Sequence, residues 1–139
     1  MIEKIESILN AKGRKQRGKI KLKKRVNITF PQNSIALIAN KNINLTIEQL
    51  KIIKLDITKT TIGLYNILFQ VLPNKPITKK GILVRMGKGK GKIDTFSCKI
   101  AENTICIILK PKILNIKNID TTILTSFLKK YPFFSKKSF

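Results

Sequence analysis

The sequence predicts an α+β fold with a mainly antiparallel sheet, two helices and an extended basic N-terminal arm. Short apolar segments that are typical of strands outnumber the segments whose apolar residues recur at helical spacing. Two of the helical segments also begin with residues that favour a helix start. The N-terminal part is dense in positive charge and cannot form a core. Because 139 residues suffice for one ordinary domain, we expect 1–25 to be a basic extension and 26–139 a single globular domain.

The N-terminal extension combines a short helix with a basic arm. Residues 2–9 place apolar side chains at helical spacing, which predicts an amphipathic helix. Residues 12–25 are mostly basic and contain no acidic side chain, so we expect an extended segment that is ordered by its partner. Its candidate phosphate-binding side chains are Lys12, Arg14, Lys15, Arg17, Lys19, Lys21, Lys23, Lys24 and Arg25.

In the first half of the domain, the sequence predicts two strands and a helix. The strands are expected at 26–30 and 35–39, with a turn between them. Thr46 and Gln49 form a capping-box pattern that begins a helix of about four turns, and Gly63 is expected to end it. The predicted apolar face of this helix contains Ile47, Leu50, Ile53, Leu55 and Ile57.

In the second half of the domain, the sequence predicts further strands and a last helix. Residues 64–72 alternate as a strand, which the two prolines at 72–76 should end. We expect a short strand at 82–84 and a hairpin formed by 93–100 and 104–109. The last helix is expected to begin at Asp120, to end before Pro132 and to bury Ile123, Leu124, Phe127 and Leu128.

The net charge indicates the class of partner. The chain has 29 Lys plus Arg against 7 Asp plus Glu, a net charge of +22. Such a surplus repels itself unless a polyanion neutralises it, so we expect nucleic acid, the alternatives being an anionic membrane surface or another acidic partner. No apolar run is long enough to span a membrane as a helix.

Enzyme, metal and cofactor sites are not expected. The chain has no histidine, and its few acidic residues are scattered, although lysine-based chemistry stays open. Cys98 and Cys106 are interpreted as small buried strand residues, since zinc needs four ligands. Residues 13–19 resemble a phosphate-binding loop but continue with Ile20 where serine or threonine should bind magnesium.

The most specific local pattern is the alternation of glycine and lysine at 87–92. Glycines at every second position allow unusual backbone angles and a close approach of the backbone to another surface. Lysines between them add positive charge. We therefore interpret this loop as a phosphate-contacting segment, the alternative being a solvated hairpin tip.

Segments 72–80 and 84–91 together carry a family resemblance. They read Leu-Pro-Asn-Lys-Pro-Ile-Thr-Lys-Lys and Val-Arg-Met-Gly-Lys-Gly-Lys-Gly, and this order and register is similar to the signature of the ribosomal protein L-sixteen family. Weaker likenesses occur at 12–14, 45–50 and 129–132. The sequence departs from the family pattern at, among others, Ala11 (histidine in the family), Phe96 (tryptophan), and Ile53 and Asp56 (arginines).

The resemblance implies an α/β-hammerhead fold and a non-enzymatic role in the large ribosomal subunit. It implies binding to large-subunit rRNA and to neighbouring ribosomal proteins, with the loop close to the peptidyl transferase centre and the tRNA acceptor arm. We add Lys75, Lys79 and Lys80 to the expected rRNA-binding residues. The expected loop residues are Arg85, Met86, Gly87, Lys88, Gly89, Lys90, Gly91 and Lys92. The alternative is an RNA-binding or chaperone-like module outside the ribosome.

Residue usage suggests the compartment. The chain has 25 isoleucines, 25 lysines and 11 asparagines but four arginines, a bias typical of A+T-rich genomes. The N-terminal segment carries Glu3 and Glu6 and does not resemble a presequence. We therefore expect an organelle-encoded protein of the mitochondrial matrix, the alternatives being a plastid or the cytoplasm of an A+T-rich bacterium.

Overall fold

The computed structural model describes residues 33–83, 87, 89–112 and 121–138. The expected helix at 2–9, the basic arm at 12–25 and the strand at 26–30 lie outside the described residues. The domain boundary after residue 25 therefore stays a prediction.

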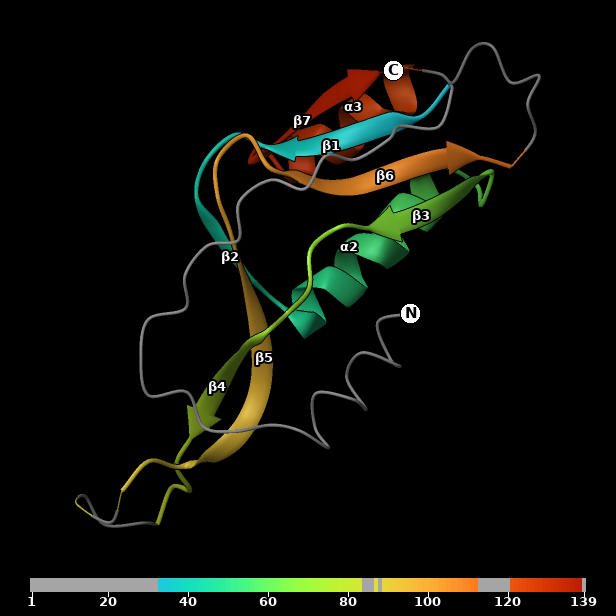
Figure 1. Ribbon diagram of the computed structural model, residues 1–139. Helices are drawn as coiled ribbons and strands as arrows, with labels where there is room; N and C mark the ends of the chain where they lie inside the picture. Colours follow the sequence, from blue (N-terminus) through green and yellow to red (C-terminus); the bar gives the residue numbers. More distant parts are fainter. Residues whose placement is uncertain (1–32, 84–86, 88, 113–120, 139) are drawn as a thin grey trace.

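Two antiparallel sheets and two helices make up the described part of the chain (Figure 1). One sheet has the strand order β3-β6-β1-β7 and the other has the order β2-β5-β4. This arrangement confirms the α+β prediction. The elements are β1 (Ile35–Ala39), β2 (Ile43–Thr46), α2 (Ile47–Thr60), β3 (Tyr65–Phe69), β4 (Lys75–Lys79), β5 (Lys92–Ile100), β6 (Ile105–Pro111), α3 (Thr121–Lys130) and β7 (Phe134–Ser138).

Helix α2 begins where its sequence predicts, but the first left-handed residue after its end is Ile62 (φ 49°), one residue before the expected Gly63. The Gln49 backbone N–H donates to Thr46 Oγ1 at 3.3 Å, and the Thr46 backbone N–H donates to Gln49 Oε1 at 2.9 Å. This reciprocal pair satisfies two backbone donors that the first turn leaves unpaired. The helix ends at Thr60, and Gly63 follows with a positive φ of 69° and donates its N–H to the Thr58 carbonyl.

The buried face of α2 is narrower than predicted. Ile47, Leu50, Ile53 and Ile57 are buried, but Leu55 is 59% exposed, so its assignment to the apolar face was wrong. Each helical residue advances by about 100°, so Leu55 lies roughly 200° around the axis from both Ile53 and Ile57. It therefore lies on the opposite side from the core.

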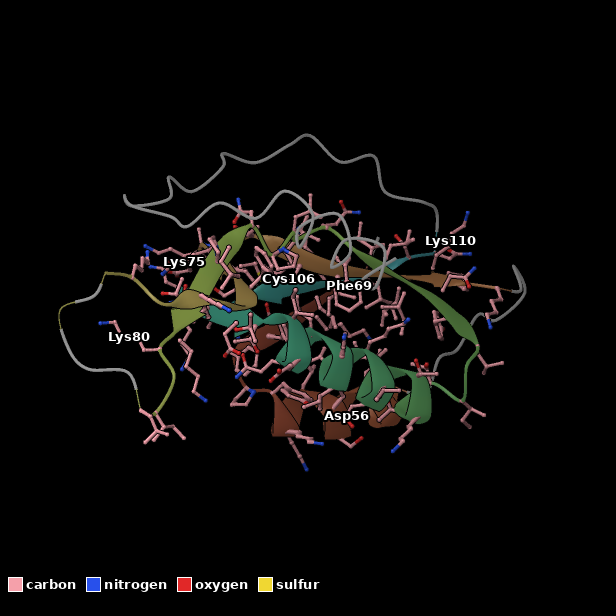
Figure 2. All side chains as sticks on the ribbon, turned by 90° about the horizontal axis from the view of Figure 1, so that it is seen from below. Asp56, Phe69, Lys75, Lys80, Cys106 and Lys110 are labelled. Carbon is pink, nitrogen blue, oxygen red and sulfur yellow. The ribbon has the colours of Figure 1, made fainter. Side chains whose placement is uncertain are left out.

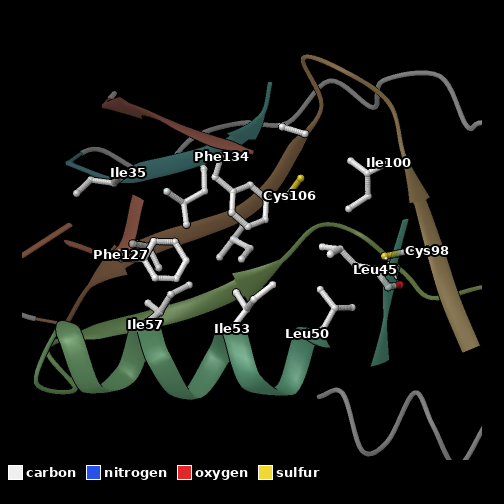
Figure 3. Close-up of a cluster of buried hydrophobic side chains, with 14 of the residues drawn as sticks. Ile35, Leu45, Leu50, Ile53, Ile57, Cys98, Ile100, Cys106, Phe127 and Phe134 are labelled. Atoms are coloured by element: carbon white, nitrogen blue, oxygen red, sulfur yellow. Dashed lines mark hydrogen bonds between the residues drawn. The ribbon is translucent and has the colours of Figure 1, made fainter. Parts of the chain in front are cut away.

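Both helices pack on one face of the four-stranded sheet. Figure 3 shows Leu50, Ile53 and Ile57 of α2 in the same cluster as Phe127 of α3 and Cys106 of β6. The ring centroids of Phe127 and Phe134 are 6.5 Å apart, which joins α3 to β7. Burial of Leu124 and Phe127 confirms the predicted face of α3, while Asp120 and the side chain of Ile123 lie outside the described residues.

The expected hairpin between 93–100 and 104–109 is wrong, although both strands exist. Strand β5 pairs with β2 and β4, whereas β6 pairs with β1 and β3. At the crossover, Asn103 has a positive φ of 58° and donates its N–H to the Ala39 carbonyl at 2.8 Å. The turn is thereby fixed to the end of β1, and the chain passes from one sheet into the other.

Other strands also differ from the predictions. Strand β3 ends at Phe69, and β4 forms despite Pro76, because an edge strand does not need every backbone donor. Strand β2 was not predicted because it has only four residues, and β7 was not predicted because four of its five residues are polar. The expected strand at 82–84 is wrong: Ile82 and Leu83 lie in a turn and are 99% and 96% exposed.

Candidate nucleic-acid interface

Four exposed lysines lie on one face of the β2-β5-β4 sheet. In the strand register, Lys79 faces Lys92, Lys75 faces Ser97, and Lys99 faces Asn44. Cross-strand partners share a face, and residues two apart on a regular strand return to it. Strand β5 has an irregularity opposite Ile77 and Thr78 that leaves Asp94 without a partner, so Lys92 lies on the face of Lys79 and not on that of Phe96. We call this surface the basic face and define it as Lys75, Lys79, Lys92 and Lys99, all of which are exposed.

The opposite face of the same sheet is part of the core. Leu45, Phe96 and Cys98 are 5%, 3% and 2% exposed and belong to the cluster that packs on α2. Because that side is closed by apolar packing, the lysine side chains are held on the outer side. The strand alternation thus separates a structural face from a charged one.

Lys79 and Lys92 bring two positive charges directly opposite one another. Like charges at facing positions of neighbouring strands destabilise the pair. Among the described residues, no carboxylate forms an ion pair with either side chain. An anionic partner placed over the basic face would relieve this repulsion.

The glycines of the loop serve two different backbone requirements. Gly87 and Gly89 have positive φ values of 103° and 79°, a region that side chains rarely adopt. Gly91 instead lies against the neighbouring strand: a Cβ there would be 2.3 Å from the Lys79 carbonyl oxygen and 2.9 Å from the Lys80 nitrogen. A side chain at 91 could not be placed without moving backbone.

The β4–β5 pair forms an arm that extends away from the four-stranded sheet (Figure 1). Figure 2 shows Lys75 on this arm and Lys80 near its tip, whereas Lys110 lies toward the other end of the molecule. A groove near the tip has both basic and apolar walls. Its lining residues are Lys79, Lys80, Gly81, Ile82, Leu83, Lys92, Ile93 and Asp94.

The structure brings together part of the residue set that the sequence suggested. Lys75, Lys79, Lys80, Lys90 and Lys92 all lie on this arm. Outside the described residues lie the nine basic residues of the N-terminal segment 12–25, together with Arg85, Met86 and Lys88. Sequence reasoning missed Lys99, because only the strand register shows that it shares a face with Lys75.

The two cysteines are buried in the core, and Cys98 lies on the face of β5 opposite to the basic face. Burial raises the pKa of the Cys106 thiol to about 12 and also raises the pKa of Cys98. Both are free and buried on strands, as predicted. In the described segments, no group of three or more potential metal ligands occurs, and no helix there has the length and apolarity to cross a membrane.

Comparison with known proteins identifies the family. The sequence profile described as Ribosomal protein L16p/L10e matches residues 8–136, nearly the whole chain. The chain belongs to the ribosomal protein L16p/L10e family. This confirms the resemblance found at 72–80 and 84–91.

Individual relatives of the L16p/L10e family match more narrowly. A large ribosomal subunit protein uL16 of Acinetobacter baumannii is 35% identical over 77 residues, 55% of this chain and 56% of that protein. The protein of the same name from Acinetobacter baylyi is 34% identical over the same share. That of Petrotoga mobilis is 40% identical over 50 residues, 36% of each chain. The chain thus aligns with about half the length of the first of these relatives.

Two departures from the L16p/L10e pattern have a structural explanation in this chain. Ile53 is 2% exposed in the core. The Asp56 carboxylate accepts hydrogen bonds from Lys130 Nζ and Tyr131 Oη, both at 2.6 Å, and these bonds lower the pKa of Asp56. These positions of α2 therefore stabilise the packing of the domain and do not present positive charge to a partner.

Proposed function

We propose that the chain is a structural component of the large ribosomal subunit and binds large-subunit rRNA through its basic face. Membership of the L16p/L10e family supports the proposal, and relatives bear the name large ribosomal subunit protein. The observation that carries it is the pairing of Lys79 with Lys92 on an exposed sheet face, where neither lysine forms an ion pair with a carboxylate of the described residues. This arrangement suits a ligand that supplies phosphates.

Binding would be mainly electrostatic. Lysines that neutralise phosphates release counterions, so affinity should fall steeply as salt rises. Phosphate contacts fix the position of a protein on RNA, and the shape of the RNA provides much of the recognition. The basic arm at 12–25 would add further phosphate contacts. No enzymatic step is proposed.

We further propose that the loop at 85–92 approaches the peptidyl transferase centre and helps to position the acceptor arm of A-site tRNA. The glycine geometry supports this role, because Gly87 and Gly89 keep the backbone free of side chains where it would approach another surface. Neighbouring large-subunit proteins would be the remaining partners.

The proposed compartment is the mitochondrial matrix, with the protein encoded in the organelle. Residue usage supports this choice, while the relatives above are bacterial. A plastid or an A+T-rich bacterial cytoplasm is the alternative. Fractionation of source cells with an antibody to the chain distinguishes these locations.

Cryo-electron microscopy of native ribosomes from the source tests the role directly. Density for the chain in the large subunit, with the basic face on rRNA and the loop near the tRNA acceptor arm, is the expected result. If the chain is in the subunit but the loop points elsewhere, the tRNA-positioning proposal fails while the rRNA-binding proposal stands. If the chain sediments apart from large subunits at moderate salt, the ribosomal role fails altogether.

A further inference from the structure

The tip of the β4–β5 arm exposes two aliphatic side chains almost completely. Ile82 and Leu83 are 99% and 96% exposed, whereas the other exposed large hydrophobic residues in the described segments range from 36% to 77%. Both follow Gly81 in a turn beyond β4. Water-exposed apolar surface of this kind favours burial against a partner.

The surroundings of the tip indicate what that partner must offer. Lys79, Lys80 and Lys92 line the same groove as Ile82 and Leu83, and these three lysines outnumber the single carboxylate of its lining, Asp94. A partner that covers the groove must therefore present both an apolar surface and negative charge. These two features must lie no further apart than about the length of one side chain. Unpaired RNA meets this requirement, because each base has an apolar face and is attached to a phosphate-bearing backbone.

Continuity with the basic face favours RNA over the other anionic partners. Lys79 and Lys92 belong both to the groove and to the basic face, so one ligand passing along β4 and β5 would reach the tip without interruption. An acidic protein surface would need its own apolar patch at the same place. A membrane would require a larger apolar area than two adjacent side chains provide.

We propose that Ile82 and Leu83 pack against exposed nucleobases of the RNA whose phosphates are bound by the basic face. This inference rests on the proposed function and adds a second kind of contact to it. The lysines supply a salt-dependent contact with the backbone. The tip supplies a contact with base faces that does not release counterions.

The test compares three double variants of the full chain in binding to transcribed large-subunit rRNA over a series of salt concentrations. Ile82→Gln/Leu83→Gln removes the apolar tip, and Lys79→Thr/Lys92→Thr removes two charges. Ile52→Gln/Leu55→Gln is the matched control, since these α2 residues are 52% and 59% exposed. Thermal melts check that all three variants fold.

We expect the tip variant to bind roughly 5- to 150-fold more weakly, the range that loss of a stacking contact with a base produces, with the salt slope of the wild type. The lysine variant should show a shallower slope, and the α2 control should bind as the wild type does. A second tip variant, Leu83→Phe, keeps an apolar surface able to stack on a base and should retain wild-type affinity.

The outcomes separate this inference from the proposed function. If the wild-type chain does not bind rRNA, the proposed function fails. If the wild type binds and the tip variant binds equally well, the nucleobase contact is refuted and the proposed function stands. If the tip variant binds rRNA normally but is not incorporated into large subunits, the tip contacts a protein instead; if it loses only binding to anionic vesicles, the tip contacts a membrane.

Discussion

The backbone of Gly91 lies directly against the carbonyl group of Lys79, so close that a Cβ at residue 91 would stand 2.3 Å from that oxygen. This contact closes the base of the glycine–lysine loop at the point where β4 ends and β5 begins. Because the same two strands carry Lys79 and Lys92, the contact also holds those two lysines opposite one another.

Gly91→Ala is therefore expected to open the end of the arm. The added methyl group would meet backbone atoms, which cannot move aside as a flexible side chain can. Gly89→Ala has open space and is disfavoured by its positive φ alone, at about 1–2 kcal/mol. Amide hydrogen exchange should show faster exchange across the β4–β5 pairing in Gly91→Ala than in Gly89→Ala. Equal protection in both variants would contradict the close-contact explanation.

Lys79→Thr should have opposite effects on stability and on binding. It removes like-charge repulsion with Lys92 and introduces a good strand former, so the melting temperature of the free protein should rise. It also removes one phosphate contact, so the slope of log affinity against log salt should fall by about 0.7–0.9. Melting curves and salt-dependent RNA binding check the two effects, with Lys54→Ala on α2 as the control. Lower stability together with an unchanged slope would contradict the assignment of Lys79 to the basic face.

Local signals predicted the helices well. Thr46 and Gln49, which cap α2, are only three positions apart in the sequence, so their pairing is a local signal. The structure contains both of the expected hydrogen bonds. The buried face of α2 was predicted correctly except at Leu55. That residue was assigned to the face because it is apolar, although its position around the helix axis points it away from the core. Cys98 and Cys106 were also interpreted correctly, because small apolar residues within strands are usually buried.

Sheet topology could not be predicted from local signals. Adjacency in the chain suggested a hairpin of β5 and β6, but β6 is inserted between β1 and β3, a pairing of residues far apart in sequence. The same limit applied to the interface. Lys75 and Lys79 stood out beside the glycine–lysine loop, whereas Lys99 shares their face only because Lys75 pairs with Ser97, two residues away on β5.

The two thiols should be inert in the folded protein. With a pKa of about 12, the Cys106 thiol is deprotonated at pH 8 in roughly one molecule in ten thousand, and burial hinders access as well. Burial also raises the pKa of Cys98. Iodoacetamide at pH 8 should label neither residue in native buffer and both in denaturant, as measured by intact mass. Fast labelling of one thiol in native buffer would show that its strand opens readily.

Thr46→Ala should lower the free energy of unfolding by about 1 kcal/mol, the usual effect of losing an N-cap side chain. The Gln49 backbone N–H would lose its acceptor, and the second bond of the capping box would lose its reciprocal partner. Chemical denaturation followed by circular dichroism measures the change. Thr46→Ser keeps the acceptor oxygen and should restore most of the stability; if Thr46→Ser is as unstable as Thr46→Ala, the hydrogen bond is not the cause.

Because the Asp56 carboxylate links α2 to α3, we expect the stability of this junction to depend on pH. Hydrogen bonds from Lys130 and Tyr131 lower its pKa below the ordinary value of 3.8. The stabilisation is therefore present above that value and is lost as the pH falls through the lower pKa of the folded state. Asp56→Asn should melt a few degrees below the wild type at neutral pH, and the difference should shrink as the pH falls below about 3.8. Glu102→Gln, at an exposed residue, serves as the control. A difference between Asp56→Asn and wild type that stays constant down to low pH would show that ionisation of the Asp56 carboxylate is not its cause. Equal melting temperatures at every pH would mean that apolar packing around Phe127 alone holds α2 and α3 together.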